Sequence, residues 1–139
     1  MLIILLERLK KMLLKSGNLS EADEQTMIFR WAAYFPELRW MYAVPNGGKR
    51  GAREAANLKR QGTKAGVSDI ALPLPKGKYH GLYLELKVGK NKPSELQKEF
   101  LKYAKEKGYA TFVCYGHEEA ISVITEYLKL KPGGEMNVY

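Results

Sequence analysis

The chain is poor in cysteine, with Cys114 as the only one among 139 residues. A single cysteine excludes a disulfide framework and a zinc site built from several thiolates. Because Cys114 lies in the apolar run from Ala110 to Tyr115, we expect a buried structural thiol, which suits a reducing cytoplasm. The chain has only two histidines, His80 and His117, and neither has a visible partner, so neither is predicted to be catalytic.

The sequence also lacks a long apolar run. Its first six residues, MLIILL, are too few to span a membrane, and charged residues follow them without the cleavage site of a signal peptide. We therefore expect no membrane association and interpret Leu2 to Leu14 as an amphipathic helix that serves packing or dimerisation. No internal repeat or low-complexity segment occurs. The predicted organisation is an N-terminal helical segment (1–18), one domain (19–130) and a flexible tail (131–139).

Positive charge is concentrated in one part of the chain. The segment from Asn46 to Lys92 holds eleven Lys or Arg residues and three acidic residues, a difference of eight, which equals the net charge of +8 for the whole chain. The remainder is therefore close to neutral. A localised basic field indicates a polyanionic partner, and nucleic acid is favoured because nothing in the sequence inserts into a membrane.

Two apolar runs carry a candidate centre for a divalent metal ion. Asp69 lies near the start of the run Val67–Leu74, and Glu85 and Lys87 lie in the run Leu82–Val88, where apolar and polar residues alternate. Because successive side chains of a strand point to opposite faces, Glu85 and Lys87 share a face, about 6–7 Å apart. The turn between the runs predicts a hairpin that brings Asp69 alongside. Carboxylates and a cation suit metal-dependent phosphodiester cleavage, while an ordinary solvated strand face is the structural alternative.

Glu24 and Gln97 are further candidates, each on a predicted helix. Ser20 caps the first of these helices, and Glu24 lies in line with its apolar stripe. A carboxylate there is costly unless it is paired or bound to metal, although the helix dipole alone also favours a Glu in the first turn. Ser94 opens a capping box that includes Gln97, so Gln97 has a structural explanation beside a role in orienting water or substrate.

The segment from Pro45 to Lys64 is a candidate nucleic-acid interface. Its PNGG sequence ends a predicted strand, Arg39–Val44, and Gly51 to Gln61 suits a helix. Glycines let the backbone approach a phosphate, and Lys and Arg give affinity without sequence preference, although a solvated basic helix face is the alternative. The predicted nucleic-acid-binding residues are Asn46, Gly47, Gly48, Lys49, Arg50, Arg53, Lys59, Arg60 and Lys64.

The predicted elements follow the order helix, helix, strand, helix, strand, strand, helix, strand, helix. This order favours an α/β fold with a small mixed sheet flanked by helices. The helix that begins at Ser94 connects Leu82–Val88 to the strand Tyr109–Tyr115. Such a crossover predicts that these strands are parallel and that the connection is right-handed. A last helix is expected from about His117 to Leu130.

These motifs, in their order and spacing, resemble the VRR-NUC family, the virus-type replication-repair nucleases of the PD-(D/E)xK superfamily. Ser68 stands where the superfamily usually has a proline, and Glu24 lies on a helix where the family carries a Glu. The resemblance extends from about Ser20 to Leu128 and implies a restriction-endonuclease-like core. The matching residues are Pro45-Asn46-Gly47-Gly48, Gly66-Val67-Ser68-Asp69-Ile70, Glu85-Leu86-Lys87 and Gln97.

The resemblance implies a Mg²⁺- or Mn²⁺-dependent DNA endonuclease. Lys87 would orient or deprotonate the attacking water, and Gln97 would position water or phosphate. The implied metal ligands are Asp69, Glu85, the Leu86 carbonyl and Glu24. Stand-alone members resemble Holliday-junction resolvases, which implies a phage-encoded or prophage-derived homodimer that cuts branched DNA in the cytoplasm of a bacterial or phage-infected cell.

Two alternatives remain open at this point. One is a nucleic-acid-binding module whose site is inactive. The other is a restriction-type nuclease of the same superfamily, which would need a dedicated base-reading segment, and none is obvious in so short a chain.

Overall fold

A four-stranded mixed sheet forms the centre of the protein. The computed structural model describes residues 1–5, 19–45 and 51–137. The strands, in their order across the sheet, are β1 (Tyr42–Ala43), β2 (Ile70–Leu72), β3 (Leu82–Lys87) and β4 (Ala110–Tyr115). The helices are α2 (Glu21–Ala32), α3 (Ala52–Arg60), α4 (Glu95–Glu106) and α5 (His117–Leu128), with a 3₁₀ turn at Pro36–Leu38. The expected α/β fold is present.

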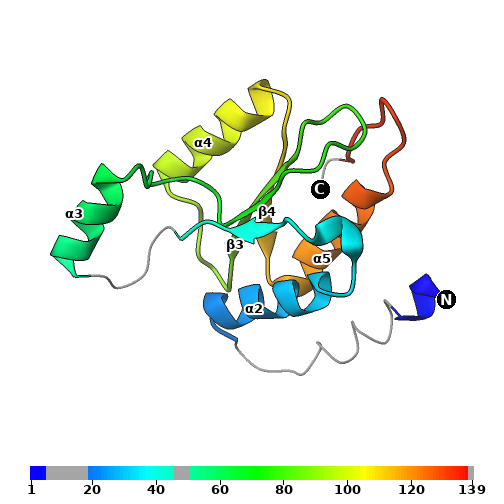
Figure 1. Ribbon diagram of the computed structural model, residues 1–139, viewed down its shortest axis with the longest axis horizontal. Coiled ribbons are helices and arrows are strands. Elements are labelled where there is room, and N and C mark those ends of the chain that lie inside the picture. The colour runs from blue at the N-terminus through cyan, green and yellow to red at the C-terminus, as the bar shows by residue number, and fades with distance from the viewer. Residues whose placement is uncertain (6–18, 46–50, 138–139) are drawn as a thin grey trace.

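The pairing of the strands follows from the connections between them. The hairpin between β2 and β3 is antiparallel, as is the β1–β2 pair, whereas β3 and β4 are parallel. The parallel pair confirms the prediction made from the crossover helix, which is α4. Helices cover both faces of the sheet, with α4 on one side and α2 and α5 on the other (Figure 1).

The two faces of β3 have different surroundings. Its three leucines are at most 2% exposed and belong to the core that includes residues of α2 and α5. On the opposite face Tyr83 packs edge-on against Phe100 of α4, with the ring centroids 5.1 Å apart. Glu85 and Lys87 continue the series begun by Tyr83, because side chains alternate along a strand. The polar pair therefore lies on the α4 face of the sheet.

Side-chain caps determine where α2 and α4 begin. The Ser20 hydroxyl accepts a hydrogen bond from the Asp23 backbone N–H, at 3.1 Å, and the Asp23 carboxylate in turn accepts one from the Ser20 backbone N–H. Ser94 and Gln97 form the same reciprocal pair, at 3.2 and 2.8 Å. Both capping boxes were predicted, and both satisfy backbone donors that the first turn of a helix leaves free.

Two elements differ from expectation near the basic segment. The strand predicted over Arg39–Val44 is reduced to the two residues of β1, because the chain forms a 3₁₀ turn and a further turn before it. The helix α3 forms as predicted, but it has no buried residue and stands apart from the sheet (Figure 1). This exposure leaves its basic side chains accessible to a partner.

The ends of the chain complete the fold. Residues 2–5 are helical, and the rest of the predicted N-terminal helix lies outside the described residues. The segment expected to be a loose tail is packed as far as Met136, which is 8% exposed and donates its backbone N–H to the Tyr79 hydroxyl at 3.0 Å. A second bond joins the Lys78 N–H to the Gly134 carbonyl at 3.0 Å. Within the described parts of the chain, no helix has the length and apolar character needed to cross a membrane.

Candidate active site

Asp69 and Glu85 meet at one end of the β2–β3 pair. Ile70 pairs with Leu84, so Asp69, which precedes Ile70, lies opposite Glu85, which follows Leu84. The Asp69 Oδ2 atom accepts a hydrogen bond from the Leu86 backbone N–H at 2.7 Å. Asp69 is 9% exposed and Glu85 is 0% exposed. The structure thus brings together the two carboxylates that the strand pattern singled out.

Burial gives the Glu85 carboxyl unusual acid–base behaviour. Its pKa is raised from 4.5 to about 8, first because burial disfavours the charged form and then because of the hydrogen bond and the negative charge of Asp69. The ammonium of Lys87 opposes this effect only in part. A proton held by Glu85 can be shared with Asp69, and this sharing relieves the repulsion between two adjacent carboxylates. In the absence of a cation, Glu85 is therefore largely protonated at neutral pH.

Each oxygen of Glu85 has a separate environment. The Oε1 atom accepts a hydrogen bond from Gln97 Nε2 at 3.0 Å and lies 3.4 Å from Lys87 Nζ. The Oε2 atom is buried and has no donor among the residues that the structure describes. When Glu85 is ionised, a buried carboxylate oxygen without a donor is unfavourable, and a metal ion at that position would remove the cost. Oε2 is thus the atom of this site that is best placed for a cation.

Gln97 performs the capping role that its sequence position suggested and also binds Glu85, while a role in orienting water or substrate stays a prediction. Its side-chain oxygen accepts the Ser94 backbone N–H of the capping box, while its side-chain nitrogen donates to Glu85. An amide can do this because it carries an acceptor and a donor on one rigid plane. The start of α4 is therefore linked directly to the carboxylate pair.

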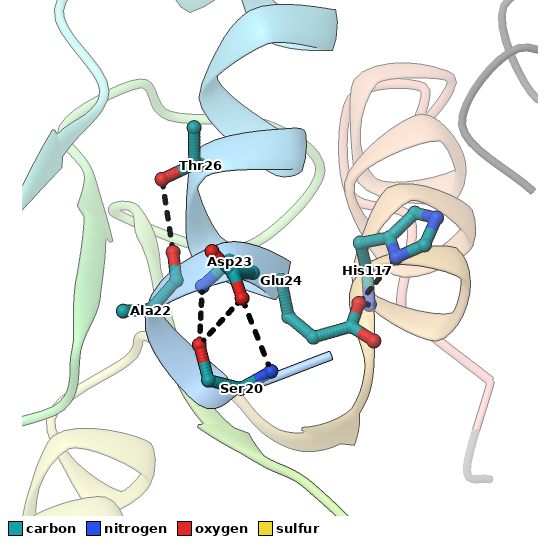
Figure 2. A network of polar contacts seen from close by, with 6 residues as sticks. All are labelled: Ser20, Ala22, Asp23, Glu24, Thr26 and His117. Carbon is teal, nitrogen blue, oxygen red and sulfur yellow. Dashed lines mark hydrogen bonds and ion pairs between the residues drawn. The ribbon is translucent and has the colours of Figure 1, made fainter. Parts of the chain in front are cut away.

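Glu21 and Glu24, two acidic residues of α2, have different surroundings. Glu24 accepts hydrogen bonds from the backbone N–H of His117, at 2.7 Å, and from the His117 ring, and so links α2 to the first residue of α5 (Figure 2). Gly116, the residue before His117, donates its N–H to the Lys87 carbonyl at 3.0 Å. Glu24 thus binds α5, one backbone hydrogen bond away from β3, and its role as a metal ligand remains a prediction.

Glu21, also on α2, is affected electrostatically by the carboxylate site. Its pKa is raised by partial burial and then by the charge of Asp69, while the charge of Lys87 opposes this. This electrostatic coupling places Glu21 within range of the site, and sequence reasoning did not single it out. Both acids follow the cap at Ser20 within the first turn. The sequence pattern offered no signal to separate them.

The basic residues of α3 lie to one side of the sheet (Figure 1). Arg53, Lys59 and Arg60 belong to α3 and Lys64 follows it, and all four are exposed. The predicted binding residues Asn46, Gly47, Gly48, Lys49 and Arg50 lie outside the described residues. At the base of the segment Gly66 adopts a φ of +89°, and a Cβ there would lie 2.6 Å from the Leu96 side chain. The backbone of Gly66 therefore lies close against the first turn of α4.

The residues present fit a hard divalent cation bound through few protein ligands. Among the described residues, no group of three or more His, Cys, Asp or Glu side chains is arranged to hold a metal ion. Asp69 and Glu85 supply two carboxylates. The Leu86 backbone follows Glu85 in the chain and donates its N–H to Asp69. Mg²⁺ commonly uses one or two carboxylates and completes its shell with water and substrate phosphate. The chemistry of the donor set therefore agrees with the divalent ion that the resemblance implies.

Comparisons with known proteins identify the family of this chain. The VRR-NUC domain profile matches residues 19–118. A solved structure described as a VRR_NUC domain protein is 32% identical, covers 84% of this chain and 94% of its own, and superposes with a TM-score of 0.72. No curated protein matches the chain. The matched domain, most of the chain, holds the two carboxylates, Lys87, Gln97 and the basic helix, and we conclude that the chain belongs to the VRR-NUC family, which implies a nuclease of the PD-(D/E)xK kind.

Proposed function

We propose that this nuclease is a Mg²⁺- or Mn²⁺-dependent endodeoxyribonuclease that acts on branched DNA as a homodimer. The observation that carries the proposal is the convergence of Asp69, Glu85 and Lys87 at one end of β3, with Glu85 Oε2 buried and without a donor among the described residues. A bound divalent cation would supply Lewis-acid polarisation of the phosphodiester and a more acidic water. The residues around it divide the remaining tasks.

The carboxylates and their neighbours would prepare the site for the cation. Asp69 and Glu85 hold it, with the Leu86 carbonyl as a further ligand and Glu21 or Glu24 acting from α2. Gln97 holds Glu85 Oε1 at 3.0 Å, which leaves Oε2 to face the cation. Binding requires the proton of Glu85 to leave, so metal affinity rises with pH up to about 8.

Lys87 is placed to act on the attacking water. It orients the water as an ammonium or accepts its proton as a neutral amine while the water oxygen bonds to phosphorus, the bond from phosphorus to the leaving sugar oxygen breaks, and that oxygen takes up a proton from solvent. Its ammonium form also offsets the charge that develops on the phosphate. Lys87 Nζ lies 3.4 Å from Glu85 Oε1. This distance supports the assignment, because a water molecule held near the Glu85 carboxylate would also lie near the Lys87 amine.

The exposed basic residues of α3 would bind the DNA backbone. Arg53, Lys59 and Arg60 are exposed and can approach phosphates, and such contacts give affinity without sequence preference. The preference for branched DNA follows from symmetry. Resolving a junction needs two cuts on opposed strands, and two active sites related by a two-fold axis supply them.

A cleavage panel tests the proposal. Purified protein is incubated with linear duplex, flap, single strand and four-way junction, each with Mg²⁺, Mn²⁺ or EDTA, and its mass is measured by light scattering. We expect metal-dependent cleavage that is fastest on the junction, a dimeric mass, and loss of cleavage but not of binding in Asp69→Asn. Glu95→Gln, an exposed carboxylate of α4, serves as the control. Binding without cleavage under every condition would favour the alternative of a binding module with an inactive site.

A further inference from the structure

Two large aromatic side chains are exposed in β1 and in the turn before it. Trp40 is 70% exposed and Tyr42 is 51% exposed, whereas the other tryptophan, Trp31, is 1% exposed in the core. A tryptophan is normally well buried, since its large apolar surface is costly to leave in water. The neighbouring exposed aromatic pair therefore indicates a surface that meets a partner.

The local chain direction explains why these side chains point outward. Leu38 and Met41 are 3% and 6% exposed and belong to the core, so they anchor the segment from inside. Trp40 and Tyr42 flank Met41 and lie on the other side of the chain. Because β1 is an edge strand, no further strand of the described sheet covers its outer side. The path of the backbone therefore leaves the Trp40 and Tyr42 side chains exposed.

The register of the sheet places Tyr42 on the same face as the active site. Tyr42 pairs with Ala71 of β2, and Ala71 pairs with Tyr83 of β3. Residues directly opposite in a sheet project to the same face, and positions two apart along a strand do so as well. Asp69 is two residues before Ala71, and Glu85 is two residues after Tyr83. One face of the sheet therefore carries both Tyr42 and the two carboxylates.

A guanidinium accompanies the exposed tryptophan. The Cζ atom of Arg39 lies 5.0 Å from the centre of the Trp40 ring, within the range of a cation–π contact. Within the described residues, Arg39 has no carboxylate partner at salt-bridge distance, so its charge is available to a ligand. An aromatic plane next to such a guanidinium matches a nucleotide, whose base stacks and whose phosphate is anionic.

We propose that Trp40, Tyr42 and Arg39 form a stacking site for an unpaired nucleotide of the DNA substrate. The proposal rests on the function proposed above and specifies which part of the substrate the face beside the carboxylates receives. Charge favours DNA over a protein partner, because β1 leads along the chain into the most basic segment of the sequence. Branched DNA offers unpaired or easily unpaired bases at its junctions, and a stacking platform would hold such a base near the metal site.

The test measures binding in EDTA, so that no cleavage is needed. The probes are a short labelled oligothymidylate and an abasic oligomer of the same length, which keeps the phosphates but has no bases. We expect wild-type protein to bind the oligothymidylate more tightly, and its tryptophan fluorescence to be quenched by that probe alone. Trp40→Ala and Tyr42→Ala should each weaken oligothymidylate binding by roughly 5- to 150-fold and leave binding of the abasic oligomer unchanged. Trp40→Phe should retain most of the affinity.

A matched control is available on the outer face of α4. Tyr103 is 59% exposed, and Lys107 Nζ lies 5.7 Å from its ring centre, so it repeats the combination of exposed aromatic ring and cation. Tyr103→Ala should bind both probes like the wild type. Equal affinity of wild type and Trp40→Ala for the oligothymidylate would overturn the stacking site while leaving the nuclease proposal intact. A fall in molecular mass caused by Trp40→Ala, with DNA affinity unchanged, would overturn it in favour of an interface between protein chains.

Discussion

The raised pKa of Glu85 predicts how the stability of the metal-free protein depends on pH. The informative change is Glu85→Gln, which keeps the shape of the side chain, still accepts the hydrogen bond from Gln97 and removes the titrating proton. Below pH 4.5 the carboxyl is protonated in both folded and unfolded protein. Between 4.5 and about 8 it ionises in the unfolded protein only, so rising pH favours unfolding. Above about 8 it ionises in both states and the loss levels off.

The size of the effect follows from the shift. Each pKa unit corresponds to about 1.4 kcal/mol, so a shift from 4.5 to about 8 costs on the order of 5 kcal/mol when fully expressed. Much of that loss has already occurred at pH 7. Between pH 7 and pH 9 the remaining loss is on the order of 1 kcal/mol. Over that pH range, the free energy of unfolding of Glu85→Gln should rise by this amount relative to that of the wild type.

Urea unfolding in EDTA at a series of pH values measures this difference. Because every other titrating group is common to the two proteins, the wild-type and Glu85→Gln curves are subtracted at each pH. Glu95→Gln, whose carboxylate is 93% exposed, should show no such pH-dependent difference. Adding Mg²⁺ or Mn²⁺ at pH 7 should stabilise the wild type, with release of close to one proton per ion. A difference between wild type and Glu85→Gln that stays constant from pH 7 to pH 9 would refute the reasoning, since Glu85 would then already be ionised at pH 7.

Three further predictions use the same structure. Glu24→Ala should lower the free energy of unfolding by roughly 1–3 kcal/mol, because it leaves the buried His117 N–H without its acceptor. Glu21→Gln should leave stability in urea nearly unchanged and instead weaken Mn²⁺ binding in calorimetry. Equal effects of the two changes would contradict the different roles assigned to Glu24 and Glu21. The double change Arg53→Ala and Arg60→Ala should weaken DNA binding for all sequences and reduce the salt slope by about one unit for each phosphate that is no longer neutralised, and an effect confined to one sequence would indicate base readout instead. Gly66→Ala should lower the melting temperature, because its φ of +89° and the nearby Leu96 both oppose a Cβ; an unchanged melting temperature would show that the backbone at Gly66 is not packed against Leu96.

Local patterns in the sequence were sufficient for the centre of the candidate site. Alternation along β3 placed Glu85 and Lys87 on one face, and the turn before β3 placed Asp69 opposite them. Both inferences depend only on the period of a strand and on short connections, which are properties of neighbouring residues. The two capping boxes were predictable for the same reason, since a cap involves residues three positions apart.

Contacts between distant segments were beyond the reach of those patterns. His117 has no partner nearby in the sequence because its partner, Glu24, lies 93 residues away on another helix. Glu21 and Glu24 share one helical turn, and the packing of α2 against α5 decides which of them faces Asp69. The packing of Met136 on the hairpin likewise depends on the folded surface that it meets.

The sequence by itself determined the chemistry of this protein: its carboxylates, its lysine, its basic segment and the alternation that aligns them. Tertiary structure alone decided the environment of each group. Burial, which no short pattern specifies, raises the pKa of Glu85 and leaves one of its oxygens without a donor among the described residues. The same is true of Trp40, because exposure of a side chain is the outcome of how all elements pack, and only the assembled fold leaves that ring in solvent.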